Sequence, residues 1–286
     1  MLTTEGQIAR RVTVANRMNS GIRISSAALM FVVAAMTVSR AQDPSGREVA
    51  AALKRTDVRP APRLADGHPD FGNAKGAWAS PSIDNLGGGK TPRGLGGAQP
   101  EKVVEVPMLP WAKALFDKRQ SNNDVADPEA FCLVPGHPRY SSNLFPFQIY
   151  QTPERILFLY EKLGTFRVVY MDRREHTPPD KWNVNFQGES IGHWDGDTLV
   201  VDILGNNDKT WLDASGHPKT EQLHLIERWH RVNELIMHYE VTVDDPGAYS
   251  KPWTNSWSML FYPGMELLDY VCEKNESILQ RMRPDK

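Results

Sequence analysis

The chain has 286 residues, and its 33 basic and 35 acidic side chains give a formal net charge of −2. Because this balance provides no long-range field, it argues against binding to nucleic acid or anionic lipid, and we expect a small-molecule partner. The roughly 245 residues that follow residue 41 are enough for one large all-β domain.

Residues 1–41 have the pattern of an export signal. The apolar stretch AALMFVVAAMTV (27–38) follows basic residues and precedes the small residues Ser39 and Ala41. At 12 residues it is too short to span a bilayer. The basic region before it is unusually long, which indicates a translation start at Met18. The alternative interpretation of the apolar stretch is a buried helix. We expect a periplasmic or secreted mature protein without a membrane span.

Residues 42–128 are predicted to be an extended arm with short helices. The helices are expected at 46–55 and at 109–120, the second with Trp111 directed toward the core. Between them, residues 57–100 contain six prolines and nine glycines and show no periodicity. This composition is typical of an arm lying on a domain or of a linker.

Residues 129–286 are predicted to form the β domain. Runs of β-branched and aromatic residues alternate there with turn signals such as Asp195-Gly196 and Pro263-Gly264. The expected strands are 145–151, 155–161, 165–171, 188–194, 198–204, two strands within 220–245, 255–262 and 265–273. Their short sequential connections favour an all-β antiparallel meander that closes into a lipocalin-like barrel around one small ligand. A two-sheet β-sandwich is the alternative.

The hairpin within 220–245 carries polar side chains on both faces. A two-residue turn at Asn233 and Glu234 would place Glu227 opposite Glu240. Two carboxylates in that position repel each other unless a cation intervenes, a proton is shared, or both face water. One interpretation is therefore an enclosed acid–base pair, and the other is that this face is the outside of the barrel.

The opposite face of the same hairpin would then line the interior. It brings His224, Arg228 and Tyr239 together among aliphatic residues, a mixture typical of ligand sites. The Asp195-Gly196 turn is expected to place His193 opposite Thr198.

From these positions we assign roles to individual side chains. His224 is the expected acid or base, Tyr239 its partner or an oxyanion donor, and Arg228 an anion anchor. Asp208, at the rim of the barrel, would orient a histidine or act as a second base. The predicted catalytic residues are His224, Tyr239, Asp208, Arg228 and His193, and the predicted substrate-binding residues are Glu227, Glu240, Trp211, Trp253 and Tyr249.

The sequence offers little support for a metal or a cofactor. His217, Glu221 and His224 have zinc-ligand spacing for a helix, whereas on a strand Glu221 and His224 point to opposite sides. There is no dinucleotide fingerprint and no haem-attachment pair. We therefore predict neither a metal nor a cofactor. Cys132 and Cys272 would be joined in an oxidising compartment, and the alternative is two separate buried thiols.

Four motifs carry a resemblance to other sequences. They are GHWDGDTLVVD, TEQLHLIERWHRV, YEVTVDDPGAYSKPWT and YVCEKN. With them the chain resembles, from about residue 130 onward, a large group of uncharacterised exported bacterial proteins. The resemblance implies an exported globular domain and carries no activity onto numbered residues.

The function expected from these observations is acid–base chemistry on a small organic molecule. The substrate would be aromatic, terpenoid or sugar-derived, and the protein would be a cofactor-independent lyase or isomerase, or else a hydrolase. The alternative is a periplasmic protein that binds such a ligand without transforming it. A third interpretation is a structural or interaction protein of the cell envelope.

Overall fold

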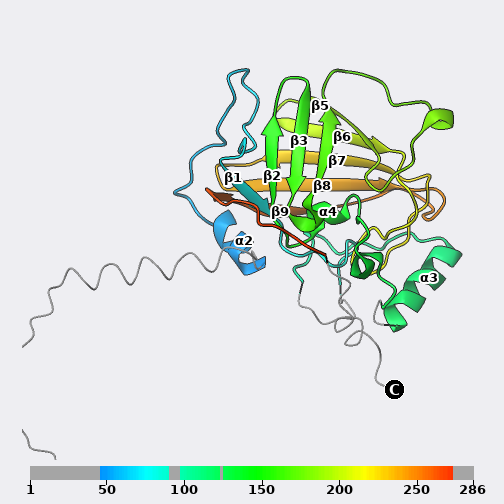
Figure 1. Cartoon of the computed structure of the whole chain (residues 1–286). Helices are drawn as coiled ribbons and strands as arrows, with labels where there is room; N and C mark the ends of the chain where they lie inside the picture. Colours follow the sequence, from blue (N-terminus) through cyan, green and yellow to red (C-terminus); the bar gives the residue numbers. More distant parts are fainter. Residues whose placement is uncertain (1–45, 90–96, 123–124, 273–286) are drawn as a thin grey trace, which may run out of the picture. The chain divides into compact units, whose positions relative to one another are not determined.

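The computed structural model describes residues 46–89, 97–122 and 125–272, so the predicted export signal lies outside the described residues. Nine strands form one closed barrel in which sequence neighbours pair and β1 pairs with β9. In Figure 1 the green strands β2 and β3 run across the yellow and orange strands β6 to β8 behind them. The expectation of an all-β barrel with short helices is confirmed.

The strands follow the alternating runs of the sequence closely. Their bounds are β1 Gly76–Ala79, β2 Phe147–Gln151, β3 Arg155–Tyr160, β4 Thr165–Tyr170, β5 Glu189–Asp195, β6 Thr198–Leu204, β7 His224–Arg231, β8 Ile236–Asp244 and β9 Trp253–Pro263. The helices are α2 Gly46–Leu53, α3 Pro110–Ser121 and α4 Arg139–Ser142, with 3₁₀ turns η2 Pro128–Phe131, η3 Lys162–Gly164 and η4 Pro179–Lys181.

The ninth strand comes from the arm and not from the C-terminal segment. Residues 265–272 contain no strand, whereas β1 pairs with both β2 and β9 and closes the barrel. A Cβ on Gly76 would lie 2.3 Å from the backbone oxygen of Tyr262, so only glycine allows this approach of β1 to β9. The barrel therefore draws on residues before 129 as well as after it.

One pair of neighbouring strands departs from the antiparallel prediction. β4 and β5 are parallel and share only two partner pairs, Val169 with Ser190 and Tyr170 with Ile191. The connection between them, residues 171–188, replaces the tight turn that an antiparallel pair would need. The barrel is consequently mixed, and the first half of β4 has no partner residue on β5.

The β7–β8 register differs by one residue from the expected register. Glu227 pairs with Val241, not with Glu240, and Trp229 pairs with Tyr239. The turn is longer than two residues because the Val232 backbone N–H donates to the Ile236 carbonyl. A one-residue slip exchanges the two faces of a strand. It separates the predicted Glu227–Glu240 pair and places the two carboxylates on opposite faces.

A smaller error affects the β5–β6 hairpin. His193 pairs with Val200, and Asp195, not His193, pairs with Thr198. The turn thus lies at Gly196 and Asp197, one position later than expected.

Aromatic rings fill much of the barrel interior. The largest fully buried side chains from its strands include Trp78, Phe147, Phe158, Trp229, Tyr239 and Trp257. The ring centroids of Trp229 and Tyr239 are 4.5 Å apart, and those of Phe158 and Trp229 are 5.0 Å apart. Such packing leaves only a few places in the interior for polar side chains.

Helices α2 and α3 pack on the outside of the barrel, whereas all four residues of α4 are buried and Tyr140 stacks on the Tyr160 ring. Val49 of α2 packs with Ile236 and Leu260 on β8 and β9. On α3 the buried residue is Ala112, whereas Trp111 is 46% exposed, contrary to the expectation that it faces the core. The indole N–H of Trp111 instead donates to the Gly247 carbonyl at the surface. No helix in the described ranges is long and apolar enough to cross a membrane.

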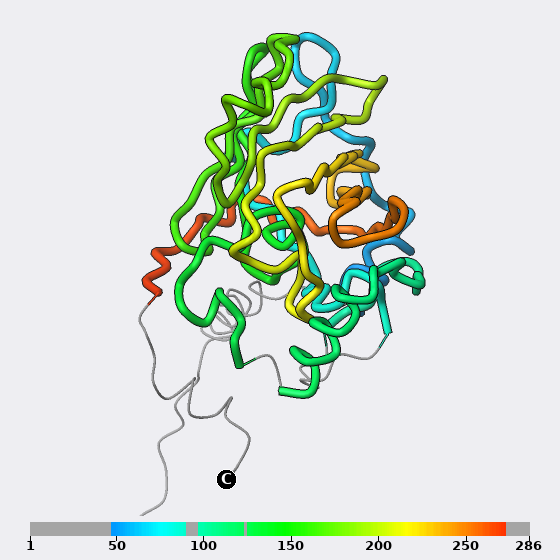
Figure 2. The backbone as a smooth tube through the Cα atoms, turned by 90° about the vertical axis from the view of Figure 1, so that its right-hand side faces the viewer, coloured from blue at the N-terminus to red at the C-terminus, as the bar shows by residue number. Residues whose placement is uncertain are grey.

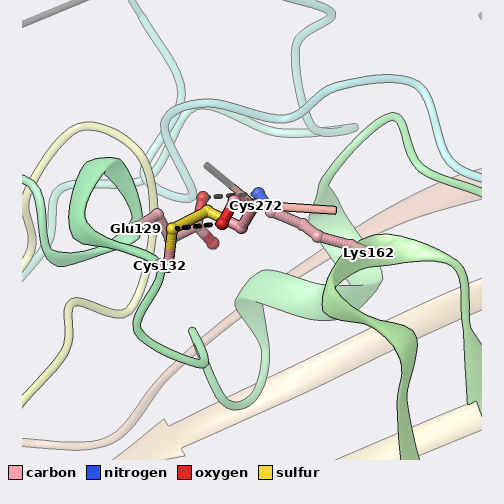
Figure 3. The surroundings of a disulfide bond; sticks show 4 residues. All are labelled: Glu129, Cys132, Lys162 and Cys272. Carbon is pink, nitrogen blue, oxygen red and sulfur yellow. Dashed lines mark hydrogen bonds and ion pairs between the residues drawn. A yellow bond between two sulfur atoms is a disulfide. The ribbon is translucent and has the colours of Figure 1, made fainter. Parts of the chain in front are cut away.

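Cys132 and Cys272 form a disulfide, as one of the two sequence interpretations predicted (Figure 3). The bond joins the η2 region to the segment that follows β9, 140 residues away. Beside it, Lys162 Nζ lies 2.5 Å from Glu129 Oε2. The disulfide closes a loop that contains eight of the nine strands.

Candidate functional site

A buried carboxylate stands among the aromatic rings of the interior. Glu227 on β7 is fully buried, and its Oε2 accepts hydrogen bonds from Arg167 Nη1 at 2.7 Å and from Trp229 Nε1 at 3.2 Å. Its Oε1 accepts a hydrogen bond from the Tyr239 hydroxyl at 2.8 Å. An isolated carboxylate would be costly in this environment, and these three donors offset the loss of water.

Arg167 approaches Glu227 from the opposite wall of the barrel. It lies on β4 and is buried, and its Nε donates to the Ser190 hydroxyl at 2.9 Å. Its Nη2 makes no hydrogen bond within the described part of the chain, and neither does the buried hydroxyl of Tyr160. Arg167 thus keeps one donor nitrogen beyond those that fix its position, and this nitrogen can donate a charge-assisted hydrogen bond to an anionic group.

His137 lies beside this ion pair. The imidazole is fully buried, with Nδ1 3.4 Å from Arg167 Nη1 and 3.6 Å from Glu227 Oε1. Burial lowers its pKa well below the ordinary value, and the positive charges of Arg167 and Lys219 lower it further. The imidazole is therefore neutral at pH 7, so that one ring nitrogen donates a hydrogen bond and the other accepts one.

Lys219 is a buried amine near the same imidazole. Its side chain is almost inaccessible, with a residue exposure of 4%, and Nζ has no hydrogen-bond partner among the described residues. Burial lowers its pKa to about 8, although the carboxylates of Asp208 and Asp245 act in the opposite direction. An amine with this pKa exchanges its proton near neutral pH, as catalytic lysines do.

Gly136 allows the segment before His137 to approach both the β4–β5 connection and Lys219. At Gly136, with φ of +77°, a Cβ would lie 2.1 Å from the Phe186 carbonyl oxygen and 3.4 Å from Lys219 Nζ. Any other residue would push the chain around His137 away from the β4–β5 connection and from Lys219. The side-chain amide of Asn206, which is fully buried, also lies close to the β4–β5 connection. A Cβ added at Gly188 would lie 2.8 Å from Asn206 Nδ2.

A hollow that Arg167 helps to line lies between β4 and the segment that leads into β5. It has a volume of about 330 Å³, at the lower end of the range for ligand sites. The lining residues include Phe166, Arg167, Tyr170, Phe186, Gln187 and Ser190. Because β4 and β5 share only two partner pairs, no continuous ladder closes the wall here. Arg167 and its hydrogen-bond partner Ser190 line the hollow, whereas His137, Lys219, Glu227 and Tyr239 are not among its lining residues.

We call the group formed by His137, Arg167, Lys219, Glu227 and Tyr239 the interior polar cluster. It contains both acidic and basic groups in an aromatic surrounding, and two of its members, Glu227 and Tyr239, were predicted as site residues. It is the strongest candidate site because buried titratable groups with perturbed pKa values concentrate at functional sites.

His224 does not belong to this cluster. It lies on the outer face of β7, its side chain is 35% exposed, and its Nε2 lies 2.9 Å from Asp202 Oδ1. The same carboxylate oxygen lies 3.0 Å from His176 Nε2, while His176 Nδ1 lies 3.0 Å from Glu189 Oε2. The predicted juxtaposition of His224 and Tyr239 is wrong, because the observed register places them on opposite faces.

Four further predicted residues also lie outside the interior. Arg228 pairs with Asp195 at 2.7 Å on the outer face. Glu240 is the cross-strand neighbour of Arg228. His193 and Asp208 are exposed, and Asp208 affects the interior only through its charge on Lys219.

The predicted substrate-binding aromatic residues make packing contacts with other parts of the chain. Trp211 lies under the Arg119 guanidinium at 4.4 Å. The Tyr249 hydroxyl donates to the Pro218 carbonyl at 2.6 Å, and its ring lies 5.6 Å from that of Trp253. All three side chains are buried in this packing.

Three members of the cluster were missed by sequence reasoning. Arg167 carries a weak signal, because period-two alternation in TFRVVY places it on the same face as the buried Val169. His137 and Lys219 lie in irregular segments, where no periodicity indicates burial. Their proximity depends on the path of two long connections.

No group of three histidine, cysteine or acidic side chains that could hold a metal ion occurs in residues 46–89, 97–122 and 125–272. Comparison of the chain with known protein families, with curated proteins and with solved structures gives no match. The functional argument therefore depends on the geometry of the interior polar cluster.

Proposed function

We propose that this protein is a cofactor-independent enzyme that transforms a small organic molecule by general acid–base catalysis in the interior polar cluster. The reaction class is a lyase or isomerase reaction, with hydrolysis as a variant of the same proton transfers. The observation that carries the proposal is Lys219, a buried amine with no hydrogen-bond partner among the described residues and a pKa of about 8.

The substrate class follows from the charges at the hollow. Arg167 Nη2 is a donor without a partner in the described chain, so the proposed substrate carries a carboxylate or another small anionic group. Glu227 holds the guanidinium in position through Nη1, and Ser190 holds it through Nε. Arg167 thereby takes the role of anion anchor that the sequence suggested for Arg228.

The remaining members of the cluster supply the proton transfers. Neutral Lys219 would remove a proton from the bound substrate, and its ammonium form would return one. His137, neutral because it is buried between two cations, would donate or accept a hydrogen bond at Nε2. Tyr239 stays protonated, since burial raises its pKa well above the ordinary value and the negative charge of Glu227 raises it further.

We also propose that the protein acts in the periplasm or outside the cell. The disulfide between Cys132 and Cys272 supports this location, because such bonds persist in oxidising compartments. The export pattern of residues 1–41 points the same way.

Proton exchange with solvent provides a direct test. The full-length mature protein would be incubated in D₂O with a panel of small hydroxy acids, oxo acids and unsaturated acids, and deuterium incorporation at carbon would be followed by NMR. We expect protein-dependent exchange for at least one carboxylate of the panel. The exchange should be lost in Lys219→Met and retained in Lys209→Met, a matched change at an exposed lysine.

The outcomes separate the enzyme from the alternative of a binding protein. Saturable binding of a panel member that weakens in Arg167→Gln, without exchange or product, would support the binding protein and remove the enzyme. Exchange at the wild-type rate in a folded Lys219→Met protein would contradict the role given to Lys219.

A further inference from the structure

A second, larger hollow lies away from the interior polar cluster. Its volume is about 700 Å³, and it is bounded by the arm, the β2–β3 turn, the segment after β4 and the second half of β5. Figure 2 shows the arm, in blue to cyan, beside the green turns at the top of the view. The lining residues include Asp66, His68, Ile156, Met171, Arg173 and Trp194.

A stacked pair of rings forms one wall of this hollow. The His68 imidazole lies on the Trp194 indole with a centroid distance of 4.6 Å and an interplanar angle of 17°. Phe71 packs against the same indole at 5.5 Å. On the arm, Asp66 Oδ2 lies 3.2 Å from His68 Nδ1, and Asp66 Oδ1 accepts a hydrogen bond from the His68 backbone N–H at 3.0 Å. The wall is thus a preformed aromatic surface.

The arm that carries this wall is itself tied to the barrel. Arg63 donates two hydrogen bonds to the Asp197 carboxylate, at 2.8 and 2.6 Å. The Phe71 backbone N–H donates to Gln151 Oε1 at 2.5 Å. These contacts hold the arm against both the β5–β6 and the β2–β3 turns, so the hollow is formed before a ligand arrives.

The floor of the hollow is apolar. Ile156 and Met171 contribute to it, and a Cβ on Gly192 would lie 2.6 Å from Met171 Sδ and 2.7 Å from Val169 Cγ1. Glycine at this position therefore allows Met171 to lie across β5. Methionine at such a place adapts to flat ligands and contacts aromatic rings favourably.

The rim of the hollow carries a positive charge. Arg173 is exposed, with φ of +61°, and none of the hydrogen bonds and ion pairs of the described chain involves it. This left-handed backbone is uncommon for a residue other than glycine, and such conformations concentrate at binding sites. Asp66, the single acidic residue among the lining residues of this hollow, is already paired with His68.

From this geometry we propose that the hollow is a second binding site, which takes a planar aromatic carboxylate. The ring would lie against the His68–Trp194 stack above Met171, and the carboxylate would accept hydrogen bonds from Arg173. The site does not depend on the interior polar cluster, since the two hollows share no lining residue.

Calorimetric titration with three probes tests the chemistry of this site. Benzoate has the ring and the charge, benzyl alcohol has the ring alone, and acetate has the charge alone. We expect saturable binding of benzoate that is at least tenfold tighter than binding of either other probe. Arg173→Gln should weaken benzoate binding roughly tenfold, the effect of losing one charge-assisted contact. Arg174→Gln is the matched control, because Arg174 is paired with Asp172.

Each contrary result would overturn the proposal. These results are absence of saturable benzoate binding, equal binding of benzoate and benzyl alcohol, and unchanged binding in Arg173→Gln. Loss of benzoate binding in Lys219→Met, with retention in Arg173→Gln, would also overturn it, because the probe would then occupy the interior polar cluster. Thermal unfolding of each variant would verify that it is folded.

Discussion

Replacing Lys219 by methionine should make the protein more stable at neutral pH. The pKa of this amine is about 8 in the folded protein, against an ordinary value of 10.5, because burial disfavours the charged form. This difference of about 2.5 units corresponds to roughly 3 kcal/mol of destabilisation while the amine is protonated in both states. Methionine fills a similar volume and carries no charge, so the variant should recover most of that free energy.

The sign of the pH dependence follows from the same shift. Between about pH 8 and pH 10.5 the unfolded chain holds a proton on Lys219 that the folded protein has released, so the wild type gains stability as pH rises. Lys219→Met lacks this gain. The free energy of unfolding of Lys219→Met should exceed that of the wild type by about 3 kcal/mol at pH 7 and by about 1 kcal/mol at pH 9.5.

Urea unfolding of both proteins at the two pH values measures this advantage. Lys209→Met, at an exposed position, should differ little from the wild type at either pH. An advantage of Lys219→Met that does not change with pH, or a destabilised variant at pH 7, would refute the argument. The first would mean that the amine is not desolvated, and the second that it has a strong partner.

Three further changes should affect stability in predictable directions. Glu227→Gln leaves the buried Arg167 without a counter-charge and should lower the free energy of unfolding by about 3 kcal/mol, as measured by urea titration. An unchanged free energy of unfolding would contradict the role given to this ion pair. Cys272→Ser removes the disulfide across a separation of 140 residues and should lower the free energy of unfolding by about 4 kcal/mol. Equal unfolding midpoints of the wild type with and without reductant would argue against this. His224→Gln should reduce the melting temperature more at pH 5.5 than at pH 8.5. The hydrogen bond to Asp202 raises the pKa of His224 in the folded protein. The stabilisation from protonated His224 is therefore complete below pH 6.5 and is lost as the pH rises through the pKa of the folded protein. A difference in melting temperature that is the same at both pH values would contradict this.

The sequence alone located the strands between residues 147 and 263, because alternation and turn signals act locally. Apart from β7 and β8, which were predicted only as two strands within 220–245, their bounds agree to within two residues. Both arm helices were predicted from local signals as well. The disulfide was one of two interpretations of the cysteines, and it rested on the expected oxidising compartment. β1 was missed, since four residues around a glycine show no period that distinguishes them from the arm.

The tertiary structure decided which polar groups lie inside. A turn longer than two residues shifts the β7–β8 register by one, which separates Glu227 from Glu240 and His224 from Tyr239. Glu227 is fully buried, whereas the His224 side chain is 35% exposed. Alternation establishes that a strand has two faces, but the choice between them depends on what packs against each.

The remaining members of the interior polar cluster depend on contacts between distant segments. Lys219 and His137 are 82 positions apart in irregular chain, and they meet because Gly136 admits the lysine and the β4–β5 connection at one point. Sequence periodicity reports on local backbone geometry, whereas the burial of a charged side chain is set by segments that fold over it from elsewhere in the chain. For this reason the sequence could predict a barrel with a polar interior, and only the folded chain could determine which residues form that interior.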